Sequence, residues 1–198
     1  MMHLIHKQQR VMVENEELRT ESVRHQYESL KNQLNPHMLF NSLNTRQSLI
    51  RESEPKALEY TQELSRVLRY TLRANDMKCV TLAEEMQFVQ AYIFLMKMRY
   101  EENLLFHIDL NEQMMGYQLP PMSVQLLIEN AIKHNVISNR NPLTISIRTE
   151  DQTLVVCNPI QAKRQMSAGP GIGLDNLAKR YRLLWQKEIQ ISAEEGMF

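Results

Sequence analysis

Five polar residues with chemically useful side chains fall within ten positions of the sequence. They are Gln125, Glu129, Asn130, Lys133 and His134, and their spacing places them along one face of a helix. An Asn oxygen suits Mg²⁺, a Lys ammonium neutralises phosphate, and a Glu carboxylate orients or deprotonates a hydroxyl group or water. The stripe is therefore compatible with a metal–nucleotide site, although composition alone favours a solvated helix face.

A second feature is a glycine-rich turn. The chain has five glycines, and three of them are Gly169, Gly171 and Gly173. They precede a helical pattern that begins at Leu174, and bare N–H groups at a helix start attract anions such as phosphate. The turn is not a P-loop, because no Gly-Lys-Ser/Thr follows. A flexible loop explains these glycines equally well.

A third feature is a histidine next to a proline. His37 follows Pro36, and Asn41 lies one helical turn later. A neutral imidazole is a competent nucleophile near pH 7, and Asn41 could hold one ring nitrogen so that the other attacks. For a single histidine, a packing role at a helix kink is the simpler interpretation.

The elements that position these residues begin with long helices. Residues 8–31 contain no Pro or Gly and predict a charged helical rod, which Pro36 should interrupt. A second helix is expected over Pro55–Ala74, with Leu64, Leu68 and Leu72 on one side. Two such helices form a hairpin that cannot cover its own apolar faces, so we expect dimerisation into a four-helix bundle.

The composition changes at residues 75–76, where we place a domain boundary. Thr81 to Glu84 reads as a capping box, followed by an amphipathic helix to Tyr100. Another helix should run from Pro121 to about Val136. Further elements are expected at 106–110 (strand), 143–148 and 154–156 (a hairpin), 161–170 (a flexible stretch), 174–185 (helix) and 188–192 (strand). The fold class is α+β: helices over residues 1–75, then a layered α/β domain with mostly antiparallel strands over residues 76–198.

Composition excludes several function classes. The 198 residues contain 23 Lys+Arg and 23 Asp+Glu, and this zero net charge disfavours direct nucleic-acid binding. Two cysteines exclude a disulfide scaffold or a Cys-based zinc site and fit a reducing compartment. No apolar run suits a membrane span or signal peptide, so we expect any membrane attachment to come from an upstream segment.

Taken together and in this order, the motifs resemble one family, the LytS/YehU-type sensor histidine kinases. The resemblance covers nearly everything from Leu30 to the end of the chain. Members of this family usually have Phe directly after the phosphoacceptor histidine, whereas this chain has Met38 after His37. The matching segments are the phosphoacceptor box at 30–44, the segment preceding the ATP domain at 91–100, the N box at 120–134 and the second glycine box at 171–177.

The resemblance implies a dimeric helical phosphoacceptor domain followed by a Bergerat-type (GHKL) ATP-binding sandwich, with ATP and Mg²⁺ as cofactors. It implies that His37 accepts the γ-phosphate and passes it to an aspartate of a response regulator. It also implies that Asn130 ligates Mg²⁺ and that Glu129 assists phosphoryl transfer. The remaining residues implied at the nucleotide are Lys133, His134, Asn158, Gly171, Gly173 and Leu174.

The resemblance further implies a homodimer and a cytoplasmic location, as part of an inner-membrane sensor protein.

One departure from the wider superfamily concerns the adenine-binding Asp-x-Gly-x-Gly box. Asn158 stands where that Asp is expected, and no glycines follow it directly. An amide oxygen accepts the same hydrogen bond without the negative charge. A dimeric pseudokinase scaffold is therefore the alternative, and an ATPase or chaperone of the same superfamily ranks last because it gives His37 no role.

Overall fold

The computed structural model describes residues 36–74, 76–161, 172–194 and 196–198. The chain forms two units, Met1–Leu43 and Asn44–Phe198. In the first unit, helix α2 (Pro36–Glu52) begins at Pro36, a position where proline's missing N–H group costs nothing. The rod predicted over residues 8–31 lies outside the described residues, as does most of the stretch predicted to be flexible.

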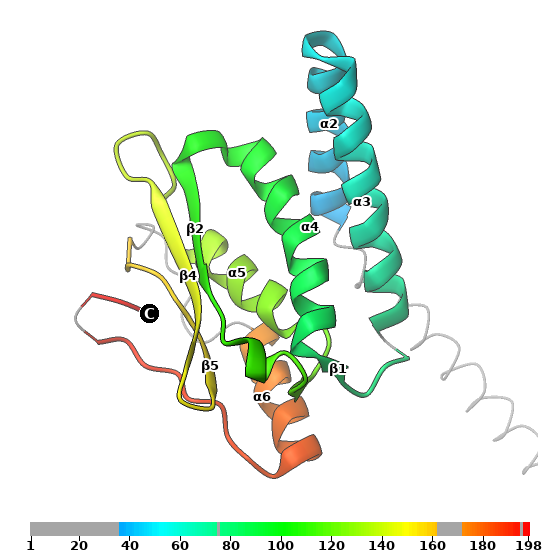
Figure 1. The fold of residues 1–198 in the computed structure, drawn as a ribbon. Coiled ribbons are helices and arrows are strands. Elements are labelled where there is room, and N and C mark those ends of the chain that lie inside the picture. The colour runs from blue at the N-terminus through cyan, green and yellow to red at the C-terminus, as the bar shows by residue number, and fades with distance from the viewer. Residues whose placement is uncertain (1–35, 75, 162–171, 195) are drawn as a thin grey trace, which may run out of the picture. The chain divides into compact units, whose positions relative to one another are not determined.

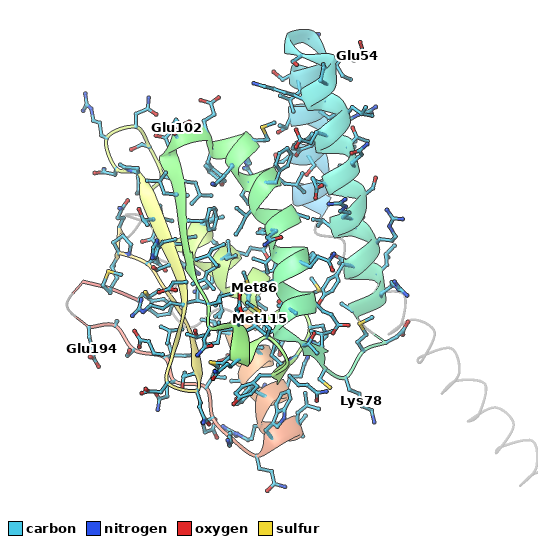
Figure 2. The ribbon with its side chains drawn as sticks, viewed as in Figure 1. Glu54, Lys78, Met86, Glu102, Met115 and Glu194 are labelled. Carbon is cyan, nitrogen blue, oxygen red and sulfur yellow. The ribbon has the colours of Figure 1, made fainter. Side chains whose placement is uncertain are left out.

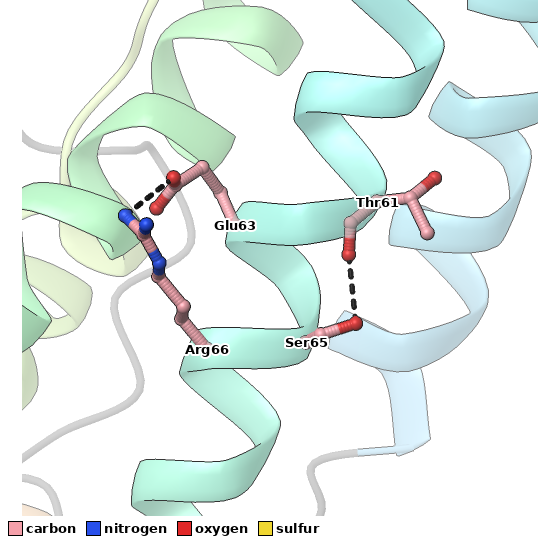
Figure 3. A network of polar contacts seen from close by, with 4 residues as sticks. All are labelled: Thr61, Glu63, Ser65 and Arg66. Atoms are coloured by element: carbon pink, nitrogen blue, oxygen red, sulfur yellow. Dashed lines mark hydrogen bonds and ion pairs between the residues drawn. The ribbon is translucent and has the colours of Figure 1, made fainter.

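In the second unit, the last turns of α2 are followed by α3 (Glu54–Ala74) (Figure 1). This confirms the predicted helix at 55–74. The Arg46 side chain donates a 3.0 Å hydrogen bond to the Thr61 hydroxyl group, which joins the two helices. Figure 3 shows two local contacts along α3, an Arg66–Glu63 ion pair of 2.8 Å and a hydrogen bond from the Ser65 hydroxyl group to the Thr61 carbonyl group. These surface contacts add little stability.

Helix α4 (Leu82–Tyr100) begins at the predicted capping box, which is confirmed. Glu84 N–H donates to the Thr81 hydroxyl group, and Thr81 N–H donates to the Glu84 carboxylate. The helix is buried on two sides rather than one, because a second stripe that includes Glu85, Phe88 and Tyr92 is covered as well. The prediction of a simple amphipathic helix is therefore incomplete.

The main sheet has the order β2-β4-β5, and its strands are β2 (Leu104–Asp109), β4 (Leu143–Glu150) and β5 (Thr153–Cys157). β4 and β5 form the predicted antiparallel hairpin, with Asp151 at φ 52° in its turn. β2 pairs in parallel with β4, which requires a crossover, and α5 (Ser123–His134) lies in it. A separate two-stranded pair joins β1 (Val80–Thr81) and β3 (Gln118–Leu119).

The core lies between this sheet and the helices that cover one of its faces (Figures 1 and 2). Inward-facing residues of β4 alternate with exposed or half-buried ones, as the two-residue period of a strand requires. Met86 of α4, labelled in Figure 2, is 4% exposed. Fully covered core residues are Val89, Leu95, Leu104, Val124, Ile128, Leu143, Ile145 and Ile147.

The predicted helix at 174–185 is confirmed as α6 (Ile172–Trp185), but the strand predicted at 188–192 is wrong. A strand needs a neighbour for its backbone groups, and residues 188–192 form no β-ladder in the described structure. Instead, Phe198 exchanges two backbone hydrogen bonds with Asn158, at 2.7 and 2.8 Å. No helix of the described part of the chain is both long and apolar enough to cross a membrane.

Candidate functional site

Helix α5 carries the polar stripe found in the sequence. Its first residue, Ser123, follows Met122, whose φ of 64° is left-handed, and Met122 makes no side-chain cap. The N–H groups at the start of this helix therefore need acceptors from elsewhere. The buried carboxylate of Glu85 on α4 supplies them: Oε1 accepts from Val124 N–H at 2.9 Å, and Oε2 accepts from Met122 N–H at 3.0 Å.

The polar stripe on α5 is not uniformly exposed to solvent, whereas the polar face of an ordinary surface helix would be. Gln125 is 7% exposed, while Glu129, Asn130 and His134 are half-buried and Lys133 is exposed. The Gln125 amide donates a 3.3 Å hydrogen bond to Oε2 of Glu129. The helix thus presents one oriented carboxylate next to an amide oxygen and two potentially cationic groups.

Tyr92 of α4 extends this arrangement beneath the helix. Burial raises the pKa of the Tyr92 phenol, the nearby Glu129 carboxylate raises it further, and a hydrogen bond with Gln125 partly offsets both effects. The phenol therefore stays neutral. Tyr92, Gln125 and Glu129 form one connected polar group at the core side of the stripe.

The C-terminal end of α5 is held by Asn135, which is 5% exposed. Its amide nitrogen donates to the Ala131 carbonyl group at 2.9 Å, and its amide oxygen accepts from Gln161 N–H at 2.6 Å. Gln161 is the last described residue before the gap at 162–171. Asn135 therefore ties α5 to the chain that enters this segment.

Asn158 lies just after β5 and is 3% exposed. Its side-chain amide nitrogen donates to the Pro159 carbonyl group at 2.8 Å. That bond fixes the orientation of the Asn158 side-chain amide.

Of the glycine box, Gly171 lies outside the described residues, whereas Gly173 and Leu174 lie in the first turn of α6. A Cβ atom on Gly173 would meet Cδ1 of Leu126 on α5 at 3.4 Å. Leu174 is 3% exposed. Gly173 therefore lies close to the helix that carries Glu129 and Asn130.

His37 and Asn41 lie on α2 in the first unit. The structure describes the backbone of His37 as helical, so the two residues are one turn apart on the same helix. Their roles remain predictions.

Two residues that organise the site, Glu85 and Asn135, were not predicted from the sequence. Glu85 does carry a signal, because it lies at helical spacing with Phe88 and Tyr92 in a stripe that is otherwise apolar or aromatic. Asn135 carries no comparable signal, since its partner Gln161 is 26 residues away.

The donor set on α5 fits a hard cation. Carboxylate and amide oxygens are the ligands Mg²⁺ accepts, usually only one or two from protein. The described residues hold no group of three or more His, Cys, Asp or Glu side chains that could bind a metal by themselves. Asn130 is the residue of this helix that would offer an amide oxygen to such an ion.

Comparisons with known proteins show which family the chain resembles. Residues 25–104 match the family described as Histidine kinase. The chain is 34% identical over 154 residues to the sensor histidine kinase BtsS of Escherichia coli K12, which is 76% of this chain and 27% of that protein. It is 31% identical over 183 residues to the sensor histidine kinase/phosphatase LytS of Staphylococcus aureus, which is 84% of this chain and 31% of LytS.

A third relative is the sensor protein kinase HptS of Staphylococcus aureus, at 35% identity over 135 residues, 67% of this chain and 26% of HptS. The chain thus spans about a quarter to a third of the length of these relatives. These matches place the chain among the sensor histidine kinases. More particularly, it belongs with the LytS/YehU type, which confirms the resemblance.

Proposed function

We propose that this chain is the kinase core of a two-component sensor: it phosphorylates itself on His37 with ATP and passes the phosphoryl group to an aspartate of a response regulator. The observation that carries the proposal is the arrangement on α5. One helix presents the Glu129 carboxylate, held by Gln125 at 3.3 Å, beside Asn130, and Gly173 of the glycine box lies close to the same helix. The named relatives are sensor kinases.

Different residues of this helix face have different roles in phosphoryl transfer. The reaction needs alignment and charge neutralisation more than covalent help from the protein. Asn130 supplies an oxygen for Mg²⁺, which when bound neutralises phosphate charge. Lys133 and His134, one turn later, face the phosphate oxygens, and the Asn158 amide takes the adenine edge. Gly171, Gly173 and Leu174 shape the lid over the nucleotide, in a Bergerat-type (GHKL) fold.

In the transfer step, a neutral imidazole nitrogen of His37 attacks the γ-phosphorus. A nitrogen–phosphorus bond forms, the bond from phosphorus to the β–γ bridging oxygen breaks, and ADP leaves with that electron pair. Glu129 accepts the proton released from the imidazole, and Asn41 holds the ring in the attacking orientation.

The helical segment fits a dimer. Ile50, Leu58 and Leu72 are 55%, 62% and 47% exposed, and a second copy forming a four-helix bundle would cover such side chains. We propose a homodimer that lies in the cytoplasm as part of a membrane sensor, with no direct nucleic-acid contact.

The test is incubation of the chain with labelled ATP and Mg²⁺. Wild type should acquire acid-labile, base-stable phosphate, His37→Gln should acquire none, and Asn130→Asp should label far more slowly. A matched control is His107→Gln, which changes an exposed histidine of β2. Equal labelling of His37→Gln and wild type would refute the assignment.

A pseudokinase scaffold is the second candidate, favoured by the neutral Asn158, whose amide nitrogen already bonds Pro159. Calorimetry with a non-hydrolysable ATP analogue and Mg²⁺ separates the two. Micromolar binding that is lost in Asn130→Ala supports the kinase, whereas the absence of binding supports the scaffold.

A further inference from the structure

The second buried stripe of α4 contains a carboxylate that the proposed chemistry does not use. Glu85 is 0% exposed. Its hydrogen-bond donors include the backbone N–H groups of Met122 and Val124 at the α5 start and the hydroxyl group of Tyr70. A buried charged group held only by dipoles is expensive to replace, because every donor loses its acceptor at once.

The Tyr70 hydroxyl group donates to Oε2 of Glu85 at 2.8 Å. This matters because Tyr70 belongs to α3, in the helical segment, whereas the other two donors belong to α5. The Tyr70 ring also stacks on Phe88 of α4, with centroids 4.1 Å apart and planes 12° apart. The stack holds the ring against α4 next to Glu85, and the hydroxyl group keeps this place only while α3 holds Tyr70 there.

The same Oε2 atom accepts from Tyr70 and from Met122 N–H. Displacement of α3 therefore changes the environment of an atom that caps α5. Val124, bonded to Oε1, precedes Glu129 by five residues, or about 7.5 Å along the helix axis. A helix is stiff over that length, so a shift at its first turn reaches the Glu129 and Asn130 side chains.

We propose that Tyr70 and Glu85 are positioning residues that couple the placement of α3 to the placement of α5. When α3 holds Tyr70 against Phe88, Glu85 caps α5 and the Glu129–Asn130 face is set. When α3 moves, the hydrogen bonds between Glu85 and the start of α5 weaken, and the Glu129 and Asn130 side chains lose their alignment. The effect on nucleotide chemistry depends on the proposed kinase function, but the coupling of α3 to α5 does not.

The probe is Tyr70→Phe, which removes one hydroxyl group and keeps the ring stack. Its matched control is Tyr60→Phe, the same change at a tyrosine of α3 that is 2% exposed, about 15 Å earlier along the helix and outside the Glu85 hydrogen bonds. Amide hydrogen exchange over residues 122–130 is measured in wild type and in both variants, without nucleotide.

Tyr70→Phe should raise exchange at the start of α5 by about tenfold, whereas Tyr60→Phe should leave it at the wild-type rate. Equal exchange in the two variants overturns the coupling. A second measurement is the affinity for an ATP analogue with Mg²⁺, which should fall in Tyr70→Phe and not in Tyr60→Phe.

If exchange rises but affinity is unchanged, the pair is only a structural cap and the positioning role is wrong. If wild type binds no nucleotide, the proposed kinase function fails, while the exchange measurement still decides whether α3 is coupled to α5.

Discussion

Nε2 of Gln125 lies 3.3 Å from Oε2 of Glu129, one helical turn later on α5. Gln125 is 7% exposed, so this bond lies on the core side of the helix, not on a solvated surface. A buried amide that donates to a half-buried carboxylate restricts how the carboxylate can turn. In the proposed kinase, this contact sets the orientation of the proton acceptor.

Replacing Gln125 by Leu should slow autophosphorylation, because the Glu129 carboxylate loses the hydrogen bond from the Gln125 amide while an apolar side chain still fills the space. We expect the initial labelling rate to fall about ten- to hundredfold, with a loss of unfolding free energy below about 1.5 kcal/mol. Gln87→Leu, at an exposed position of α4, is the matched control. A wild-type rate in Gln125→Leu would show that the contact has no role in orientation.

Two neighbouring glutamates of α4 should respond very differently to substitution by Ala. Glu85→Ala leaves Met122 N–H, Val124 N–H and the Tyr70 hydroxyl group without their acceptor, which should lower the free energy of unfolding by about 3 kcal/mol or more. Glu84→Ala removes only an exposed capping contact and should have a much smaller effect. Urea denaturation of both variants measures the difference, and comparable losses would contradict the buried-cap interpretation.

Glu85 should also make stability depend on pH. Burial raises its pKa above the ordinary value of 4.5, although hydrogen bonds from Tyr70 and the α5 start oppose the shift. The folded state then keeps this proton to higher pH than the unfolded state, so the contribution of Glu85 to stability is fully present below pH 4.5 and is lost as pH rises through the folded pKa. Burial raises the pKa of Tyr70 as well, so its phenol stays protonated throughout.

The measurement is the Tm of wild type and Glu85→Gln from pH 4 to 8. The advantage of wild type over the variant should shrink as pH rises. The pKa of Glu84 is shifted in the opposite direction, because hydrogen bonds from Thr81 lower it. The contribution of Glu84 to stability is therefore lost only as pH falls below 4.5. A wild-type advantage that grows with pH would show that the N–H donors outweigh burial at Glu85.

Gly173→Ala separates packing from mobility in the glycine box. The new Cβ atom would make an ordinary contact with Leu126 at 3.4 Å, and Ala favours a helix over Gly by up to about 1 kcal/mol. We therefore expect a higher Tm together with slower autophosphorylation, since a lid that must move is stiffened. Gly116→Ala, where a Cβ atom meets nothing within 4 Å, is the control. A lower Tm in Gly173→Ala would contradict the packing described here.

The predicted boundary at residues 75–76 remains a prediction. α3 packs against α4 through the Tyr70–Phe88 stack. Helix α3, which precedes the predicted boundary, is therefore in direct contact with α4, which follows it.

Local signals in the sequence determined most of the secondary structure. The Thr81–Glu84 capping box, the α3 and α6 helices and the β4–β5 hairpin each depend on residues within a few positions of one another, so spacing alone predicts them. The polar stripe on α5 is readable for the same reason, because helical periodicity places residues 125, 129, 130, 133 and 134 on one face. The strand predicted at 188–192 was wrong because a strand exists only with a pairing partner, which local composition does not report.

Tertiary structure alone decided which polar residues are buried and what they hold. Glu85 caps a helix that begins 38 residues later, and Asn135 meets Gln161 across 26 residues. The choice of partner carries no periodic signal in either case, since each contact depends on how two distant segments pack. The sequence indicates which side chains could do chemistry, whereas packing determines which of them are held in place to do it.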